Sequence, residues 1–396
     1  MSANALFRPT FADLRAELAR RAAQGASTEE LDTLVEGFLA LGGDTPAPWV
    51  EYDGTVTWLY RDSQAQRVSV VGDILGHAPD QNRMTRLPGG DLFALTGQLP
   101  LDARIAYAFE VDMDGQPGQH RADPLNPKRM VAAAPLRALS ILEMPNARRV
   151  PELDDGLADD GVGVVYQVVA SADQATWARV WVFLPPGYDP DERRYPTLYL
   201  DGGESYLLSG RAAQIVDALQ LQGEVVPLIA VFVQRDDAGH APEEGLDARY
   251  VGFLADELVP WVDAHYATST DPQERVIGGA GAGGSLALYA ALERPDAFGR
   301  ALAQSPLARA LPGLVADLLL RNAGRGFGAP HCYVDVGRYE PPAQLEGVHA
   351  LCAALLGDGA VVSYQDFGGD HSFVGWRTTL PDALRFHFGA PPLPAL

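Results

Sequence analysis

The sequence predicts a molecule of the α/β class, in which a mostly parallel sheet covered by helices on both faces follows a β-sandwich with a helical lead-in. Three observations support this prediction. Near-continuous apolar runs alternate with helical patterns beyond residue 163, which is typical of strands buried on both faces. Short β-branched and aromatic runs separated by Asp, Gly and Pro fill residues 48–145. Apolar residues at helical spacing fill residues 11–42.

The first part of the chain divides into three predicted segments. Residues 1–45 form the helical lead-in, and STEE is the capping signal of its second helix. Residues 46–149 form an immunoglobulin-like β-sandwich, because runs such as RIAYAFEVD alternate apolar side chains onto one face. The acidic run VPELDDGLADDGVG at 150–163 is predicted to be an exposed linker, since nothing in it could bury a face.

The second predicted domain spans residues 164–396. It opens with a hairpin, VVYQVVA and ARVWVFLPP, and continues with the runs TLYLDGG, LIAVFVQ, RVIGGA, RALAQS, HCYVDVG and VVSYQDF. Helical patterns lie between these runs, including residues 250–266 and 342–357. Parallel strands need crossover connections, which are usually helices. The alternation therefore predicts a parallel sheet with helices on both faces.

Composition excludes several classes of protein. The 52 acidic and 30 basic residues give a formal charge of −22, so a nucleic acid is not an expected partner. The N-terminus lacks the pattern of a signal peptide, and no apolar run approaches the roughly 20 residues of a membrane span. We therefore expect a cytoplasmic protein with no membrane partner. Cys332 and Cys352 have no metal-ligand spacing, so they are expected to be buried and no metal site is predicted.

The stretch GGAGAGG at 278–284 admits two interpretations. It contains the spacing G-x-G-x-x-G of a dinucleotide-binding loop. It also has the form of a hydrolase nucleophile elbow, G-x-S-x-G, with Gly281 at the position of the serine. A dinucleotide fold places its glycine loop after the first strand and an acidic residue at the end of the next strand. Here several strands precede the loop and the next run ends in Gln304 and Ser305, which disfavours a nucleotide-dependent oxidoreductase.

The elbow interpretation predicts further site residues downstream. In a hydrolase sheet the nucleophile, acid and histidine follow in chain order, the last two on loops after later strands. Glu340 follows the run HCYVDVG and His371 follows VVSYQDF, which are the expected places. Asp335, inside HCYVDVG, competes with Glu340 for the role of acid. The backbone N–H groups of Ala282 and Gly203 are the expected oxyanion donors.

With these motifs in place, the chain resembles the enterobactin (enterochelin) esterase family, α/β hydrolases of the esterase D-like type that open the trilactone of ferric catecholate siderophores. The resemblance covers residues 45–390. Its motifs follow in family order, from VTWLYRD, VVGD, MTRLPGGDLFALT and HRADPLNP to WVFLPPGY, LYLDGG, FLADELVPWV, ALYAALERPDAFGRALAQSP and GGDHSFVGWR. The resemblance implies an α/β-hydrolase domain that follows an N-terminal sandwich in the sequence. It also implies no cofactor and a small-molecule ester or ferric catecholate ligand. The oligomeric state stays open.

The chain departs from the family at the nucleophile, because Gly281 has no side chain that could form an acyl-enzyme. Losing the nucleophile costs a serine hydrolase on the order of a million-fold in turnover. Ser285 supplies a hydroxyl in a loose G-x-S-x-A, but it lies one helical turn further on and is expected to point away from His371. The chain is therefore either a hydrolase impaired at this position or a non-catalytic relative that binds or assembles.

An anionic catecholate would need positive charge and aromatic surface at its site. Arg235, Arg338 and Arg377 follow strands or lie near His371, and they are candidates for binding the anion. Trp376 is a candidate for stacking on an aromatic ligand. Each of these side chains has an ordinary structural role as its alternative.

Overall fold

The computed structural model of the protein describes residues 9–72, 80–88, 90–113, 116–132, 137–154, 163–170, 177–235, 246–308 and 311–390. The chain divides into two compact units, Met1–Arg148 and Arg149–Leu396. Part of the predicted linker, residues 155–162, lies outside the described residues.

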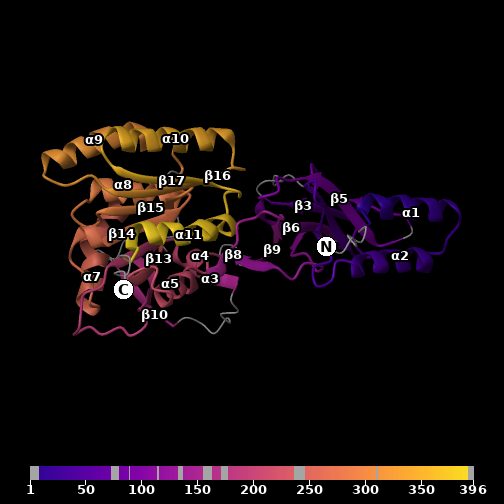
Figure 1. Ribbon diagram of the computed structural model, residues 1–396, viewed down its shortest axis with the longest axis horizontal. Coiled ribbons are helices and arrows are strands. Elements are labelled where there is room, and N and C mark those ends of the chain that lie inside the picture. The colour runs from indigo at the N-terminus through magenta and orange to yellow at the C-terminus, as the bar shows by residue number, and fades with distance from the viewer. Residues whose placement is uncertain are drawn as a thin grey trace, which may run out of the picture. The chain divides into compact units, whose positions relative to one another are not determined.

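The N-terminal unit contains two helices followed by strands (Figure 1). The helices are α1 (Phe11–Ala23) and α2 (Thr28–Ala40). The strands are β1 (Trp49–Val50), β2 (Thr55–Arg61), β3 (Arg67–Val71), β4 (Thr85–Arg86), β5 (Leu92–Gln98), β6 (Arg104–Met113), β7 (Gln116–Arg121), β8 (Arg129–Ala132) and β9 (Arg137–Glu143). Two antiparallel sheets result, in the orders β1-β2-β5-β4 and β3-β6-β9-β8, with β7 paired to β6.

The helical lead-in is part of this unit and shares a core with its first sheet. The capping signal is confirmed, because the Ser27 hydroxyl accepts from the N–H of Glu30 and the Glu30 carboxylate accepts from the N–H of Ser27. Apolar side chains of both helices pack with Trp49 of β1 and Leu59 of β2. The second sheet packs on the first through aromatic contacts, with Tyr60 and Phe109 at 4.9 Å between ring centroids.

The C-terminal unit alternates strands and helices, as the sequence predicts. Its strands are β10 (Val164–Ala170), β11 (Trp177–Phe183), β12 (Thr197–Asp201), β13 (Ile229–Arg235), β14 (Arg275–Ala280), β15 (Arg300–Gln304), β16 (His331–Gly337) and β17 (Val361–Phe367). Its helices are α3 (Pro151–Asp154), α4 (Gly203–Leu208), α5 (Ala212–Leu221), α6 (Ala248–Phe253), the π-helical η1 (Leu254–Leu258), α7 (Val259–His265), the 3₁₀ turn η2 (Pro272–Glu274), α8 (Ala282–Glu293), α9 (Leu311–Gly324), α10 (Pro342–Gly357) and α11 (Phe373–Phe388).

These strands form one sheet in the order β10-β11-β13-β12-β14-β15-β16-β17. The hairpin β10-β11 and the pair β11-β13 are antiparallel, and every later pair is parallel. Because the parallel strands share a direction, the carboxyl ends of β12, β14, β15, β16 and β17 lie at one edge of the sheet. The glycine turn after β14 lies at the middle of that edge, which does not fit the first-strand position of a dinucleotide loop.

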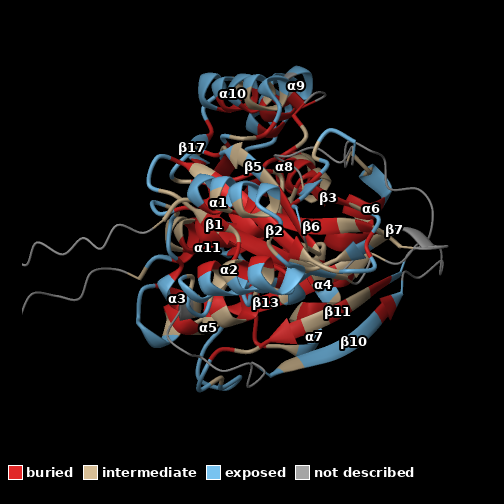
Figure 2. Cartoon of the chain, turned by 90° about the vertical axis from the view of Figure 1, so that its right-hand side faces the viewer, coloured by how far each residue is buried: buried red, intermediate tan, exposed pale blue. Residues whose placement is uncertain are grey.

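Helices cover both faces of this sheet, as predicted. One core joins the sheet to α6, η1, α7, α8, α9 and α10, and the other joins it to α3, α4, α5 and α11. The central strands are buried, whereas β10 at the edge is largely exposed (Figure 2). Cys332 and Cys352 are unpaired and buried in the first of these cores, which confirms the expectation for both.

The beginning of the predicted linker is ordered, which differs from the expectation. Residues 151–154 form α3, and Val150 before it is buried in the core shared with α5 and α11. Glu152 is 4% exposed and forms an ion pair with Arg385 at 2.7 Å. The acidic composition of this run did not indicate that Val150 is buried in the core. It also did not indicate that Glu152 pairs with Arg385 in the last helix of the unit.

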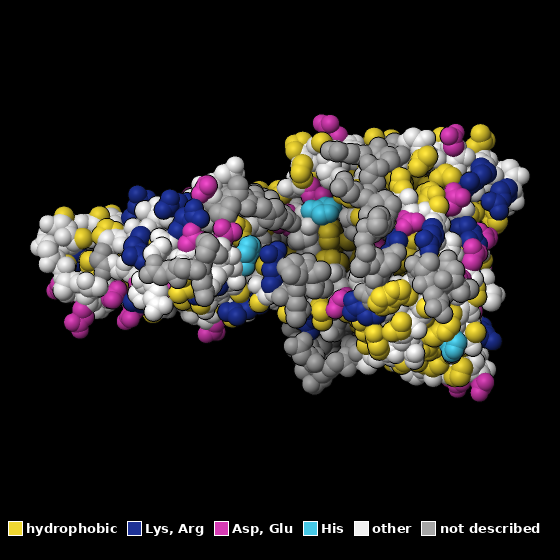
Figure 3. All heavy atoms as spheres, turned by 180° about the vertical axis from the view of Figure 1, so that it is seen from behind, with side chains coloured by type: hydrophobic (Ala, Val, Ile, Leu, Met, Phe, Trp, Pro, Cys, Tyr) yellow, Lys and Arg dark blue, Asp and Glu magenta, His cyan; other side chains and the backbone are white. Residues whose placement is uncertain are grey.

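The surface carries mixed charge. On the face drawn in Figure 3, Lys and Arg side chains are interspersed with Asp and Glu on both units. No helix among the described residues combines the length and apolarity that crossing a bilayer requires. Within the same residues no cluster of His, Cys, Asp and Glu could hold a metal ion.

Candidate active site

The turn between β14 and α8 has the backbone of a nucleophile elbow. Gly281 has φ 58° and ψ −121°, a conformation that glycine adopts without steric cost and that strains other residues. Its N–H donates to the carbonyl of Gln304 at 2.8 Å. A Cβ on Gly279 would lie 2.4 Å from the backbone of Gly283, so the strand and the helix approach too closely for a side chain there. The glycines therefore serve the tight turn.

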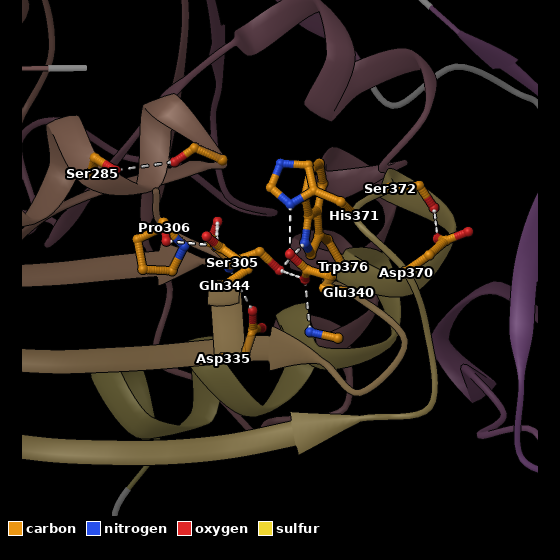
Figure 4. A network of polar contacts seen from close by, with 12 residues as sticks. Ser285, Ser305, Pro306, Asp335, Glu340, Gln344, Asp370, His371, Ser372 and Trp376 are labelled. Atoms are coloured by element: carbon orange, nitrogen blue, oxygen red, sulfur yellow. Dashed lines mark hydrogen bonds and ion pairs between the residues drawn. The ribbon is translucent and has the colours of Figure 1, made fainter. Parts of the chain in front are cut away.

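His371 and Glu340 meet beside this turn (Figure 4). The Nδ1 atom of His371 lies 2.7 Å from Oε2 of Glu340. Because an ionised carboxylate only accepts, Nδ1 donates and Nε2 is the ring's basic nitrogen. That Nε2 lies 2.9 Å from the position that a Cβ on Gly281 would occupy. The imidazole thus faces the apex of the turn at contact distance, as the chain order of the motifs predicts.

Glu340 is held by several donors. The hydroxyl of Ser305 donates to its Oε1 at 2.5 Å, and the N–H of Gly337 donates to the same oxygen at 2.8 Å. The Glu340 side chain is 0% exposed and that of His371 is 35% exposed. The carboxylate is therefore fixed inside the protein while the imidazole reaches its surface.

Asp335, the alternative acid, lies behind this pair and does not contact His371 in the network of Figure 4. Its Oδ1 accepts from the N–H of Ser305 at 3.1 Å and its Oδ2 accepts from the hydroxyl of Thr379 at 2.6 Å. Burial raises the pKa of the Asp335 carboxyl to about 7, an effect that these hydrogen bonds oppose. The structure thus brings Glu340, rather than Asp335, to the imidazole.

The two expected oxyanion donors begin helices. Ala282 is the first residue of α8, and Gly203 is the first residue of α4 after Gly202 in the left-handed conformation. The first N–H groups of a helix have no acceptor within it, so they are available to an anion. A Cβ on Gly203 would lie 2.6 Å from the backbone of Phe232 and Val233 in β13. Close approach of α4 to β13 therefore requires glycine at this position.

The structure gives partners to the candidate ligand-binding side chains. Arg235 forms an ion pair with Asp247 at 2.7 Å and lies over the ring of Tyr250. Arg338 lies 3.5 Å from Asp366 with a half-exposed side chain, and Arg377 is buried in α11. These contacts give Arg235 and Arg338 a structural role beside the predicted one, and burial gives one to Arg377.

Trp376 is buried and contacts the catalytic candidates from within the protein. Its indole N–H donates to the hydroxyl of Ser305 at 2.8 Å. Its ring packs edge-on against the His371 ring, with 4.9 Å between centroids. This geometry supports a role in holding His371, whereas stacking on a ligand stays a prediction.

Ser285 does not replace the missing nucleophile. Its side chain is buried, and the hydroxyl donates to the carbonyl of Leu307 at 3.1 Å. Figure 4 draws no contact between Ser285 and His371.

Sequence reasoning missed two polar residues at the same edge of the sheet. Ser305 follows β15, the neighbour of β14, and it contacts Glu340. Asp201 ends β12, the other neighbour of β14, with Oδ2 3.1 Å from the position of a Cβ on Gly283. Burial raises the pKa of the Asp201 carboxyl to about 6. In the sequence, Ser305 and Asp201 are marked only as polar residues at the ends of apolar runs. Chain order does not show which strands are neighbours in the sheet, so neither residue could be placed at the site.

Two family models match the chain. The model described as "Enterochelin esterase, N-terminal" matches residues 55–153, and the model described as "Putative esterase" matches residues 174–325. Together they cover parts of both units.

The same similarity extends to individual proteins. The iron(III) enterobactin esterase of Dickeya dadantii is 25% identical over 395 residues, which cover 86% of this chain and 90% of that protein. The structure of the enterobactin esterase from Shigella flexneri in the presence of 2,3-dihydroxy-N-benzoyl-glycine is similar with a TM-score of 0.68 and 26% identity, covering 84% of this chain and 92% of that one. The structure of the same enzyme in the presence of enterobactin shares the fold, with a TM-score of 0.69, 24% identity, and coverage of 84% and 92%.

Proposed function

The chain belongs to the enterobactin esterase family, and from that membership we propose that it is a hydrolase of small esters of catechol-bearing compounds, impaired as it stands because Gly281 cannot form an acyl-enzyme. The observation that carries this proposal is the position of Gly281. It has the backbone of the elbow apex and lies opposite Nε2 of His371, yet it offers no atom that could attack a carbonyl.

The other groups of the site support binding of an ester at this edge of the sheet. We assign to His371 the role of general base and to Glu340 the role of orienting its ring. The N–H groups of Ala282 and Gly203 would polarise the ester carbonyl. All four groups remain in place without a nucleophile, because none of them depends on a side chain at residue 281 for its position.

The relatives support the proposed class of ligand. A similar esterase has been solved in the presence of enterobactin and of a dihydroxybenzoyl amide. We propose that this chain recognises the same aromatic, anionic kind of molecule, free or as its ferric complex. Arg338 would contribute positive charge, because its half-exposed side chain follows β16 next to Glu340.

Two finer expectations accompany the proposal. The packed N-terminal sheets are proposed to have immunoglobulin-like topology, which an experimental structure would test. A cytoplasmic location is the second expectation, and fractionation of cells that produce the protein would test it.

Restoring the nucleophile tests the proposed function. We expect Gly281→Ser to hydrolyse a chromogenic acetyl ester, and then a catecholate trilactone, while the unmodified chain leaves both intact apart from the slow background. The matched control is Gly281→Ser combined with His371→Ala, in which the gained activity should disappear.

The alternative is a non-catalytic relative that uses this region only for binding or assembly. A folded Gly281→Ser protein with no activity on either substrate would favour it. Titration of the unmodified chain with ferric catecholate gives the second arm of the test, because no affinity up to millimolar concentration would remove the proposed ligand class.

A further inference from the structure

We infer that Ser305 is a positioning residue for the His371–Glu340 pair, and that its hydroxyl holds the Glu340 carboxylate in the orientation that turns the imidazole toward Gly281. The inference goes beyond the proposed function, on which it rests only for the kinetic part of its test. It starts from a residue to which the sequence analysis gave no role in the site.

Ser305 has a strained backbone at a central place in the sheet. Its φ is +45°, a left-handed conformation that residues with a Cβ adopt rarely, and it is fully buried. Such conformations persist only where the surroundings enforce them, and they concentrate at functional sites. Ser305 directly follows β15, which pairs with β14 on one side and with β16 on the other. It therefore lies between the strand that leads to Gly281 and the strand that leads to Glu340.

The hydrogen bonds of Ser305 have a fixed direction. The indole N–H of Trp376 can only donate, so at 2.8 Å the Ser305 oxygen accepts from it. The single hydroxyl proton is then given to Oε1 of Glu340 at 2.5 Å. The other carboxylate oxygen accepts from Nδ1 of His371. A continuous chain of donors thus runs from Trp376 through Ser305 to the carboxylate that binds the imidazole.

The strained backbone places the Ser305 groups for this task. Its N–H donates to Asp335 at 3.1 Å, and its carbonyl accepts from the Gln344 side chain at 3.3 Å. Both main-chain polar groups are satisfied, which anchors the residue while its hydroxyl points to Glu340. Without that hydroxyl, the donor that holds the Oε1 atom would be the N–H of Gly337, at 2.8 Å. The carboxylate would then be less restrained against rotation.

A purely structural role of Ser305 is the competing explanation. In that case the hydroxyl only satisfies the Trp376 indole, and its removal would lower stability without changing the state of His371. Two substitutions in the chain as it stands separate the explanations. Ser305→Gly removes the hydroxyl and relieves the positive φ, so it should fold, whereas Ser305→Ala removes the hydroxyl and keeps the strain. Ser285→Ala is the matched control, since it deletes another fully buried serine hydroxyl.

The first readout is the His371 imidazole in the chain as it stands, observed by NMR. We expect the strongly deshielded Nδ1–H signal to broaden through exchange with water in Ser305→Gly and Ser305→Ala, and to persist in Ser285→Ala. We also expect the pKa of His371 to fall in both Ser305 variants, because a loosely held carboxylate stabilises the imidazolium less. His349, on α10, provides the internal reference. An unchanged Nδ1–H signal and an unchanged His371 pKa in a folded Ser305→Gly protein would overturn the inference.

The second readout is kinetic and uses the Gly281→Ser background. Adding Ser305→Gly should lower kcat by about 10- to 100-fold at unchanged KM, the equivalent of one hydrogen bond to a charged group. Adding Ser285→Ala should leave both constants unchanged. If Gly281→Ser is itself inactive, the proposed function fails, and the NMR readout still decides the role of Ser305. If Gly281→Ser is active and Ser305→Gly leaves its kcat unchanged, the positioning role is wrong.

Discussion

Gly281 combines two properties that usually exclude each other, since it fills the catalytic position of the turn and it relieves the strain of that position. A serine or an alanine at φ 58° would be strained. In addition, its Cβ would meet Nε2 of His371 at 2.9 Å, which requires the flexible end of the imidazole to shift by a few tenths of an ångström. The turn is therefore expected to be more stable with glycine than with the residue that catalysis needs.

The first prediction at this scale concerns stability. We expect Gly281→Ala to destabilise the C-terminal unit by about 1–3 kcal/mol, the usual cost of a positive φ in a residue with a side chain. Urea unfolding followed by fluorescence measures the difference. Gly252→Ala is the control, because Gly252 lies in α6 with nothing near the added Cβ and should gain up to about 1 kcal/mol. Equal effects of the two substitutions would contradict the account of strain at residue 281.

The second prediction concerns pH and Asp335. Burial raises the pKa of the Asp335 carboxyl from its ordinary value of 3.8 to about 7, so between these values the folded state holds more protons than the unfolded state. Stability then falls as pH rises through that window. We expect Asp335→Asn to lose this contribution, so that its urea midpoint rises relative to that of the unmodified chain between pH 4 and pH 7. The comparison cancels the opposite slope from His387, whose pKa burial lowers to about 3. A difference in midpoint that does not vary with pH would refute the prediction.

At the scale of elements, the site depends on how closely α4 and α8 approach the sheet. Both expected oxyanion donors begin a helix, and Gly203 brings the first of these helices against the backbone of β13. A Cβ at residue 203 would clash with main-chain atoms of β13, which cannot rotate out of the way as a side chain can. The position of α4 is thus coupled to a single missing Cβ.

The third prediction follows from that contact. We expect Gly203→Ala to displace α4 and, in the Gly281→Ser background, to lower kcat by about 10²-fold or more, the usual cost of one lost oxyanion donor. Gly313→Ala in α9 is the control, since nothing lies near its added Cβ, and its kcat should stay unchanged. Full activity of Gly203→Ala would remove Gly203 from the oxyanion site.

Much of this element structure could be predicted from the sequence, because it depends on local patterns. The two N-terminal helices, the alternation in the second unit and the places of Gly281, Glu340 and His371 all follow from periodicity and chain order. Ser305 and Asp201 could not be recognised, since their roles come from strands that are neighbours in space. The order of residues 150–154 could not be predicted either, because the partner of Glu152 lies 233 positions further along the chain.

At the scale of the whole molecule, the chain consists of two units with separate cores. The clusters that bury the C-terminal sheet contain only residues from Val150 onward, and the cluster around α1 and α2 contains only residues of the first unit. Units with their own cores generally fold independently.

The fourth prediction tests this division. We expect residues 149–396, produced alone, to unfold in one cooperative transition at the denaturant midpoint of the same unit in the full chain. Calorimetry and near-UV circular dichroism check the result. A chain lacking a cooperative transition, or one that keeps secondary structure without near-UV signal, would show that the second unit needs the first.

The burial of Cys332 and Cys352 has a practical consequence for the whole molecule. Burial raises the pKa of both thiols to about 12, so the folded protein offers almost no thiolate to an alkylating reagent at neutral pH. Labelling by iodoacetamide should therefore report opening of the C-terminal unit. Each molecule that acquires the tag has exposed its interior at least once. The rate of labelling of these two buried thiols therefore measures how long the native state persists before it opens.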